Sequence, residues 1–217
     1  KNQLLQLAND FEKLPSVEYA VLQPITLIAP PSTPDLTSHQ HYKYDQYSGE
    51  SNVYGIDAEY AWSIGITGQS VKIADIEWGF NYQHEDLTGS NFVDLVPSVR
   101  NNDGADHGTA VAGIMYAKNN GIGMTGMVYG ADKFYGISEF SSNPNYQDRI
   151  YGITQGMQVL SAGDVFVYEM QAGGVNGYVP ADYNQAVWDI TKAATDAGII
   201  VVAAAGNGSE NLDAPEY

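Results

Sequence analysis

From about Tyr54 onward, short apolar runs alternate with stretches in which apolar residues recur at helical spacing. The compact apolar runs predict β-strands at 71–77, 133–137, 164–170 and 199–206. The helical patterns predict α-helices at 107–117, at roughly 145–160 and at 182–197. Near-continuous apolar strands separated by helices are typical of a parallel sheet with helices on both faces. The pattern therefore predicts an α/β fold over most of the chain.

Two of the predicted helices have an apolar face. In the first helix, this face consists of Ala110, Val111, Ile114 and Met115. In the last helix, it consists of Ala186, Val187, Ile190, Ala193, Ala194 and Ala197. Asp182 stands at the start of the last pattern. Because its short carboxylate can accept hydrogen bonds from the free amides of a helix start, we expect Asp182 to be the N-cap.

The first 53 residues differ from the rest of the chain in their sequence pattern. The stretch NQLLQLANDFEKL predicts a short helix, and after Pro15 the stretch VEYAVLQ (17–23) predicts a strand. Residues 24–52 contain four prolines and then a polar, Tyr-rich stretch, which is typical of an extended linker with little regular structure. His39 and His41 have metal-ligand spacing, but they have no third ligand nearby, and we expect them on the solvated surface. We divide the chain into an N-terminal extension (1–35), a linker (36–53) and a main domain (54–217).

The composition restricts the partners of the protein. Asp and Glu number 26 against 9 Lys and Arg, which gives a formal net charge of -17. Such a surface repels phosphate backbones and anionic membranes, so we expect neither a nucleic acid nor a membrane as partner. The absence of cysteine excludes a thiol nucleophile, thiolate metal ligands and disulfides, but it does not identify the compartment. The longest purely apolar run, 199–205, is too short to span a bilayer.

The stretch DHGTAVAGI (106–114) places a histidine at the start of a predicted helix. The partial positive charge of a helix start favours a neutral imidazole, and a neutral imidazole can accept a proton, as a general base must. His107 is therefore either a general base or a histidine that caps its helix. Taken by itself, this stretch leaves both interpretations open.

Four stretches resemble motifs of the subtilisin-like serine proteases (subtilases), in the order of that family. DHGTAVAGI resembles the histidine motif, with Ala110 where a second histidine usually stands, and VKIADIEWGFNYQHEDL (71–87) resembles the acid motif. AKNNGIGMTGMVYGA (117–131) is similar to the calcium loop, and AGIIVVAAAGNGS (197–209) to the strand that ends in the oxyanion asparagine. The resemblance extends from about Tyr54 to Asn211. It implies a subtilisin-like fold and a secreted serine endopeptidase that hydrolyses peptide bonds in proteins.

The resemblance also implies catalytic roles. His107 takes the position of the general base and Asn207 that of the oxyanion donor. Counting to Gly79 and to the HEDL stretch places the family's aspartate at Glu77, which is a departure from the pattern. Residues two apart on a strand face the same side, so Asp75 can also point toward His107 and is the alternative acid. An arrangement in which neither carboxylate contacts His107 is a third option. The implied reaction needs no cofactor.

The nucleophilic serine of the family stands in a Gly-Thr-Ser-x-Ala motif that is absent from this sequence. Ser209, in GNGSE, lacks that motif and a following apolar helix, and we interpret it as a loop residue. The resemblance therefore implies that a missing or separate C-terminal polypeptide carries the serine, either as the associated half of a cleaved protein or because the chain is a truncated fragment. Two other interpretations stay open: a catalytically silent subtilase-fold binding or structural protein, and an inactive zymogen. The stretch LPSVEYAVLQP (14–24) resembles the end of a subtilase prodomain, which motivates the zymogen interpretation.

Two binding sites follow from the same resemblance. An extended peptide substrate is expected to pair with the strand formed by Met170, Gln171, Ala172 and Gly173, although the usual Ser-Leu-Gly pattern is not matched. A structural calcium ion is expected to bind the side chains of Asp86 and Asn120 and the carbonyl oxygens of Lys118, Ile122 and Met124. The alternative for this second stretch is a plain β-turn loop without an ion.

Overall fold

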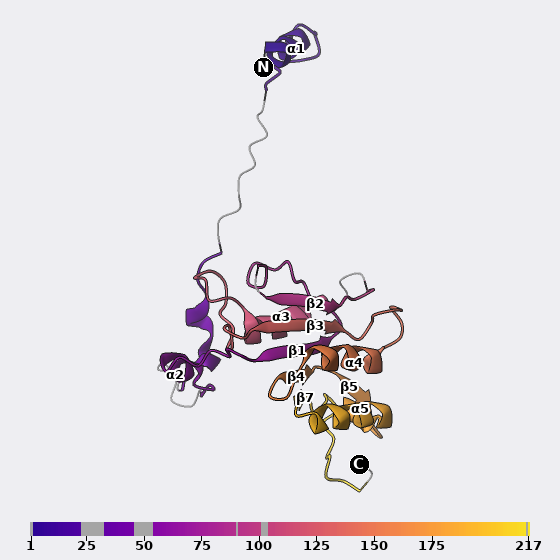
Figure 1. Ribbon diagram of the computed structural model, residues 1–217. Coiled ribbons are helices and arrows are strands. Elements are labelled where there is room, and N and C mark those ends of the chain that lie inside the picture. The colour runs from indigo at the N-terminus through magenta and orange to yellow at the C-terminus, as the bar shows by residue number, and fades with distance from the viewer. Residues whose placement is uncertain (1, 23–32, 46–53, 90, 101–103, 216) are drawn as a thin grey trace. The chain divides into compact units, whose positions relative to one another are not determined.

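Figure 1 shows the computed structural model of the chain, which describes residues 2–22, 33–45, 54–89, 91–100, 104–215 and 217. The chain divides into two compact units, Lys1–Ser32 and Thr33–Tyr217. In the first unit, helix α1 (Asn2–Glu12) confirms the predicted helix. The predicted strand at 17–23 is wrong over its described part. Residues 17–22 form no strand, and Tyr19 and Val21 are 71% and 73% exposed.

The second unit is built on a five-stranded parallel sheet in the order β2-β3-β1-β4-β7. The strands are β1 (Lys72–Glu77), β2 (Phe92–Val96), β3 (Lys133–Ser138), β4 (Val165–Tyr168) and β7 (Ile200–Ala203). The four predicted strands are therefore confirmed, but β4 and β7 are clearly shorter than the predicted ranges 164–170 and 199–206. The fifth strand, β2, was not predicted, because the charged side chain of Asp94 interrupts its apolar run.

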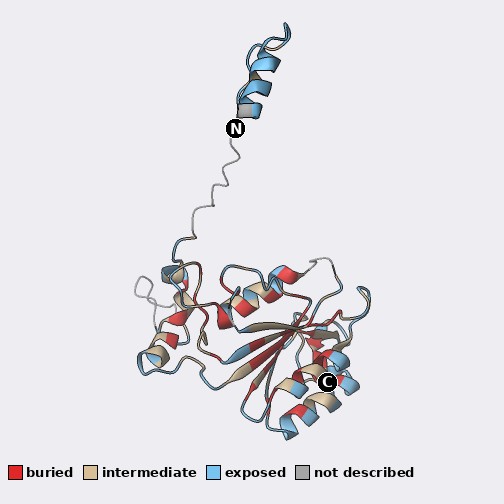
Figure 2. Cartoon of the chain, turned by 45° about the horizontal axis from the view of Figure 1, so that its top comes forward, coloured by how far each residue is buried: buried red, intermediate tan, exposed pale blue. Residues whose placement is uncertain are grey.

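Helices cover both faces of this sheet, as predicted (Figures 1 and 2). One face carries α3 (Ala105–Tyr116), and the opposite face carries α4 (Arg149–Val159) and α5 (Gln185–Asp196). A short helix, α2 (Ala58–Ser63), precedes β1. None of the helices in the described ranges is long and apolar enough to cross a membrane.

The start of α5 corrects the predicted cap. The side chain of Asn184 accepts hydrogen bonds from the backbone N–H groups of Ala186, at 3.0 Å, and Val187, at 3.4 Å. Asn184 is therefore the N-cap, and Asp182 lies in the preceding 3₁₀ turn, η3 (Ala181–Tyr183). Both residue types suit a cap, so the sequence alone did not distinguish them.

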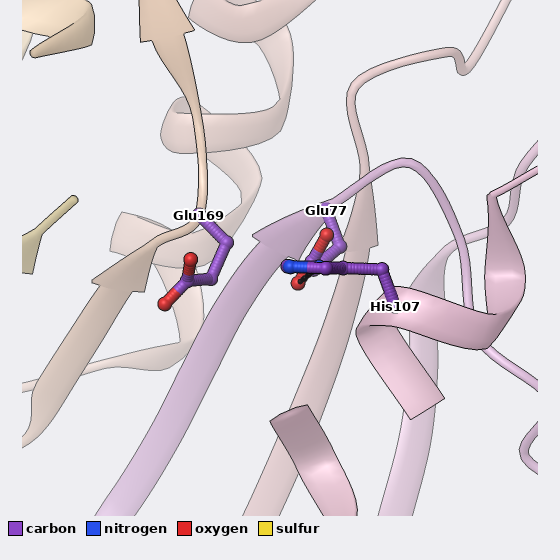
Figure 3. Close-up of side chains that lie close together, drawn as sticks. All are labelled: Glu77, His107 and Glu169. Carbon is purple, nitrogen blue, oxygen red and sulfur yellow. Dashed lines mark hydrogen bonds and ion pairs between the residues drawn. The ribbon is translucent and has the colours of Figure 1, made fainter. Parts of the chain in front are cut away.

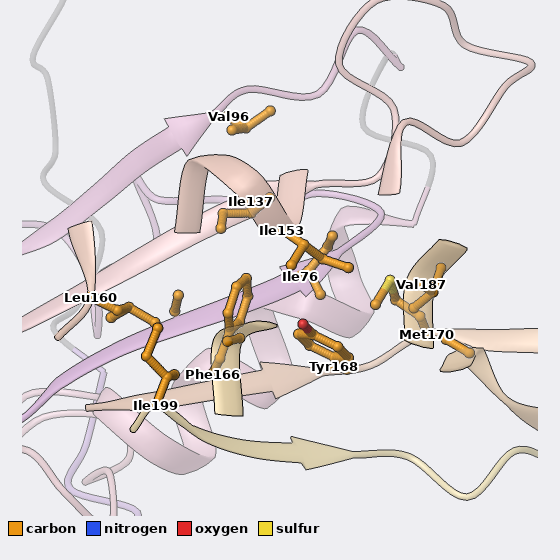
Figure 4. Close-up of a cluster of buried hydrophobic side chains, with 13 residues drawn as sticks. Ile76, Val96, Ile137, Ile153, Leu160, Phe166, Tyr168, Met170, Val187 and Ile199 are labelled. Carbon is orange, nitrogen blue, oxygen red and sulfur yellow. The ribbon is translucent and has the colours of Figure 1, made fainter. Parts of the chain in front are cut away.

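The larger core lies between the sheet and the pair α4 and α5 (Figure 4). Ile76, Ile137 and Phe166 from the three central strands are fully buried there against Ile153 of α4. The helix can approach the sheet closely because α4 presents glycine to it. A β-carbon at Gly152 would lie only 2.9 Å from the Ile76 side chain. Small residues on the helix thus set the thickness of this layer.

The apolar face predicted for α3 is only partly the buried one. The buried residues of α3 are Ala105, Gly108, Ala112 and Tyr116. Val111 and Met115 are half-buried, whereas Ala110 is exposed and Ile114 is 47% exposed. In α5, Val187 and Ala194 of the predicted face are buried and Ile190 is half-buried, but the alanines 186, 193 and 197 are exposed. The helical period was right in both helices, but the buried face of α3 includes smaller residues, Gly108 and Ala112, than the pattern suggested.

The described part of the predicted linker, residues 33–45, is more ordered than expected. It contains two 3₁₀ turns, η1 (Thr37–His39) and η2 (His41–Lys43), and Asp35 bridges to Gly123. Gln40 is fully buried, and its amide bonds both the N–H and the C=O of Thr125, at 2.9 and 2.8 Å. Tertiary hydrogen bonds therefore fix this segment. His39 is exposed as expected, whereas His41 is half-buried. The rest of the predicted linker lies outside the described residues.

Candidate functional site

Glu77 and His107 form a hydrogen-bonded pair at the carboxyl end of the sheet (Figure 3). Glu77 is the last residue of β1, and His107 lies in the first turn of α3. His107 Nδ1 lies 2.7 Å from Glu77 Oε1. The Glu77 side chain is only 2% exposed, whereas that of His107 is 64% exposed. A buried carboxylate thus orients the imidazole through Nδ1, which leaves Nε2 for proton transfer.

Two glycines allow α3 to start so close to β1. Gly104 caps the helix with φ at +86°, and a β-carbon there would collide with the side chain of Trp78. A β-carbon at Gly108 would overlap the carbonyl oxygen of Gly79 and would lie 3.1 Å from Cγ of Glu77. The glycine that follows the histidine is therefore required by the packing of the helix against the strand that carries the acid.

The two candidate acids differ in their surroundings. Burial raises the pKa of Glu77 to about 7, because the positive charge and hydrogen bond of His107 offset only part of the desolvation. Asp75 is completely buried, and neither of its carboxyl oxygens has a hydrogen-bond partner among the described residues. Burial and then the charges of Glu77 and Glu169 raise the pKa of Asp75 well above its usual range. The structure thus brings Glu77, and not Asp75, into hydrogen-bond contact with His107.

A third carboxylate, Glu169, lies beside this pair and was not among the predicted site residues. One oxygen of Glu169, one oxygen of Glu77 and a ring nitrogen of His107 lie within 4.8 Å of one another, close enough to ligate a small cation together (Figure 3). Glu169 directly follows β4. Its signal in the sequence was its position at the carboxyl end of a parallel strand, where α/β folds carry functional side chains.

Asn207 lies in the same groove as the Glu77–His107 pair. This groove has a volume of about 1060 Å³, and the pair, Glu169 and Asn207 all line it. Asn207 is exposed in the loop after β7, where Gly206 takes a positive φ of +90°. Its backbone N–H donates to Oε1 of Gln171 at 2.9 Å. The predicted base and the predicted oxyanion donor therefore face one cavity.

The predicted substrate strand also lines this groove. Gln171, Ala172 and Gly173 form β5 (Gln171–Gly173), which pairs with β6 (Tyr178–Pro180) in a short antiparallel ribbon. Met170 directly precedes β5 and also lines the groove, but its side chain is only 2% exposed and packs in the core. Three further lining residues, Glu139, Arg149 and Tyr178, had no sequence signal that pointed to them.

The predicted calcium loop wraps around the carboxylate of Asp86. Oδ2 of Asp86 accepts a hydrogen bond from the backbone N–H of Met124 at 3.2 Å. Oδ1 is buried and has no hydrogen-bond partner among the described residues, and a β-carbon at Gly123 would overlap it. Asn120 Oδ1 accepts from the N–H of Ile122 at 3.2 Å, and the Lys118 backbone N–H donates to the carbonyl oxygen of Asp86. The Lys118 side chain donates to the carbonyl oxygen of Thr88.

Ser209 does not join the candidate catalytic groups. It is exposed, it takes a positive φ of +55° in the loop after Asn207, and it is absent from the lining of the groove. It therefore behaves as the loop residue that the sequence predicted.

Comparison with known proteins places these observations in a family. The sequence model of the Subtilase family matches residues 68–217. Alkaline elastase YaB from Bacillus sp. (strain YaB) is 35% identical over 164 residues, which cover 74% of this chain and 40% of that protein. Subtilisin E from Bacillus subtilis (strain 168) is 35% identical over 147 residues, which cover 67% of this chain and 36% of that protein. The chain thus spans 40% or less of the length of these two relatives.

A solved structure supports the fold. Fervidolysin from Fervidobacterium pennivorans, described as a keratinolytic enzyme related to subtilisin, superposes with a TM-score of 0.53. The sequences are 22% identical, and the match covers 69% of this chain and 23% of that one. The parallel sheet with helices on both faces is therefore a subtilisin-like arrangement, as the sequence motifs implied.

Proposed function

The chain belongs to the subtilase family, and from this premise we propose that the protein is a secreted serine endopeptidase that hydrolyses peptide bonds in protein substrates. One observation carries the proposal: buried Glu77 holds His107 Nδ1 at 2.7 Å in a groove that Asn207 also lines. An acid, an imidazole and an amide donor on one cavity are the parts that acyl transfer through a serine requires.

In the proposed reaction, the serine oxygen attacks the carbonyl carbon of the scissile bond while Nε2 of His107 takes the hydroxyl proton. Glu77 accepts the hydrogen bond from Nδ1–H and stabilises the imidazolium that forms. The side-chain amide of Asn207 donates to the oxyanion of the tetrahedral intermediate. His107 then gives its proton to the leaving amine, and an acyl-enzyme ester remains. Water hydrolyses this ester by the same proton transfers in the opposite order.

We propose that the serine is carried by a C-terminal polypeptide that associates with this chain. An apolar groove of about 640 Å³ supports this, because it reaches the catalytic groove at Glu169, which lines both. Its walls include Ile114 and Val202, which are 47% and 53% exposed. An exposed apolar hollow is a place where another segment can pack. A helix with an apolar face seated there would lie beside Glu169, which lines the catalytic groove as well.

A fluorophosphonate probe tests the proposal, because it reacts with a serine only when the base beside it is in place. The purified protein is treated with the probe, separated on a denaturing gel and measured by intact mass, with His107→Ala as the control. We expect label on a polypeptide that co-purifies with residues 1–217, and loss of label in the control. Absence of label from every species in the wild-type preparation would refute the proposal and favour a catalytically silent subtilase-fold protein.

We also propose that the loop around Asp86 binds a structural Ca²⁺. The donor set fits a hard cation, since Asp86 Oδ1 is buried without a hydrogen-bond partner among the described residues and Gly123 leaves room beside it. Asp86 and Asn120, with the carbonyl oxygens of Lys118, Ile122 and Met124, would hold the ion. Such an ion would tie the loop to the turn that follows β1 and contribute to stability without taking part in the reaction.

Two further assignments rest on the same family membership. We propose that the protein is secreted, which is tested by fractionating the producing cells and measuring the protein in the medium. We also propose that residues 1–35 are the remnant of a prodomain. N-terminal sequencing of the active form is expected to show whether this segment stays attached, and its retention as an intact extension of active enzyme would contradict a role as a removable folding aid.

A further inference from the structure

A series of hydrogen bonds crosses the floor of the groove. It connects β1, which carries Glu77, to the loop after β7, which carries Asn207 and is called the oxyanion loop below. The backbone N–H of Glu139, just after β3, donates to the carbonyl oxygen of Glu77 at 2.7 Å. Oε2 of Glu139 accepts from Nε of Arg149 at 2.5 Å, and Nη2 of Arg149 donates to the carbonyl oxygen of Gln171 at 2.8 Å. Oε1 of Gln171 then accepts from the backbone N–H of Asn207 at 2.9 Å.

We propose that Glu139, Arg149 and Gln171 act as positioning residues. Through the backbone N–H of Asn207, they hold its side-chain amide at its place in the groove. This inference rests on the proposed function, because it gives Asn207 the role of oxyanion donor. None of the three residues is needed to touch the reacting atoms. Each acts through the next residue in the series, and the last of them bonds the main chain of Asn207 itself.

The burial of the ion pair argues for a rigid series. The side chain of Glu139 is 1% exposed and that of Arg149 is 13% exposed. Burial raises the pKa of Glu139, and the charge of Arg149 counteracts this. Buried charges of this kind are held by their partners, and removal of either partner is strongly unfavourable. Arg149 is suited to the task because its planar fork donates to two acceptors at once, a carboxylate and a backbone carbonyl.

The position of Asn207 explains why such support is needed. Asn207 is exposed, and it follows Gly206, whose φ of +90° is open to few other residues. The next residue, Gly208, bonds the carbonyl oxygen of Tyr178 in β6 through its N–H at 3.1 Å. Gln171 thus ties the oxyanion loop to β5 while Gly208 ties it to β6. An oxyanion donor works only when it is held in place before the charge develops, so this anchoring would act on the transition state.

Three variants separate positioning from a general structural role. Gln171→Leu removes the acceptor, and Gln171→Glu keeps an acceptor oxygen at the same place. Arg149→Lys keeps the charge beside Glu139 but loses the planar fork that also reaches the carbonyl oxygen of Gln171. Gln83→Leu, at an exposed site outside the groove, is the matched control. The measurements are kcat and KM on a peptide substrate, and hydrogen exchange of the backbone N–H of Asn207.

In Gln171→Leu we expect kcat to fall about tenfold or more, but less than the roughly 10²–10³ lost when an oxyanion donor is deleted, with KM nearly unchanged. Exchange of the Asn207 amide should be at least about fivefold faster, since its hydrogen bond is lost. Gln171→Glu should restore most of both values, and Arg149→Lys should lie between. The control should match the wild type.

Wild-type kcat and wild-type Asn207 exchange in Gln171→Leu would overturn the inference while leaving the proposed function intact. Equal losses in Gln171→Leu and Gln171→Glu would also overturn it, because they would show that the acceptor oxygen is not what matters. If the fluorophosphonate probe labels no wild-type species, the proposed function fails by itself. In that case Asn207 exchange in the same variants still decides whether the series holds the loop.

Discussion

Replacement of Glu169 by glutamine should move the acid limb of the activity profile to lower pH. Glu169 is a negative charge beside Glu77, and a like charge disfavours ionisation of a neighbouring carboxyl. Its removal therefore lowers the pKa of Glu77 from about 7. The carboxylate that orients His107 would then persist at more acidic pH, and the variant should retain a larger fraction of its maximal rate there.

The size of the shift follows from the geometry. The nearest carboxyl oxygens of Glu77 and Glu169 are at most 4.8 Å apart. At that distance, Coulomb's law gives about 0.9 kcal/mol in a water-like dielectric and about 3.5 kcal/mol at an effective dielectric of 20. These energies correspond to roughly 0.6 and 2.5 pKa units. Glu169 is half-buried, so water screens part of the interaction, and we expect a downward shift near the lower figure, about 0.5 to 1 unit.

The assay is the pH dependence of kcat/KM on a chromogenic peptide from about pH 5 to 9, since this ratio reports the free enzyme. The midpoint belongs to the Glu77–His107 pair as a unit, so the carbon-13 shift of the Glu77 carboxyl carbon, followed by NMR, provides a second measurement. Glu85→Gln removes the same charge from an exposed site outside the groove and should leave the midpoint unchanged. An unchanged or higher midpoint in Glu169→Gln, with a normal control, would refute the coupling.

Three further predictions concern stability and packing. Gly108→Ala should abolish fluorophosphonate labelling and lower the melting temperature, because the new β-carbon overlaps the carbonyl oxygen of Gly79. The control is Gly113→Ala on the same helix, whose β-carbon meets nothing within 4 Å and which should be neutral or stabilising by up to about 1 kcal/mol. Equal melting temperatures of the two variants in calorimetry would contradict this prediction. Glu77→Gln should flatten the pH dependence of unfolding. Because the pKa of Glu77 is raised to about 7 in the folded protein, protonation of Glu77 contributes to the stability of the wild type. This contribution, roughly 3 kcal/mol, is fully present below about pH 4.5 and is lost as the pH rises through about 7. Denaturant titrations at several pH values measure it. Chelation of Ca²⁺ should lower the melting temperature of the wild type but not of Asp86→Asn, and a wild type indifferent to chelator would argue against the ion.

The sequence predicted the sheet well because parallel strands buried on both faces leave a nearly continuous apolar run. The exception, β2, contains the charged side chain of Asp94, which interrupts its apolar run. The face of α3 was predicted less well, because large apolar residues were taken as the contact. The residues that pack most closely are Gly108 and Ala112, since a helix lies nearest to a strand where its side chains are smallest.

The candidate site divides in the same way. Glu77, His107 and Asn207 were located by short motifs, and the structure brings them to one groove. Glu139 and Arg149 had no local signal, and Gln171 was predicted only as part of the substrate strand, so the series that joins the three was not predicted. Its members are separated by 10 and 22 residues and lie just after β3, at the start of α4 and in β5, so only the tertiary fold brings them together. Propensity and periodicity describe neighbours along the chain, and they are silent on such contacts.

This chain has glutamate at position 77, where the subtilase motif has aspartate. The difference has a physical consequence beyond the length of the side chain. The extra methylene is accommodated without loss of the hydrogen bond, since Glu77 still meets His107 at 2.7 Å. The carboxylate is buried, however, and Glu169 places a negative charge beside it. Asp75 lies two residues earlier on the same strand, and its own pKa is raised well above the usual range by burial and then by the charges of Glu77 and Glu169. Glu77 must be ionised to hold a protonated imidazole in the proposed reaction, so its pKa would set the pH at which the site becomes competent, and Glu169 is the residue through which that pH can be adjusted.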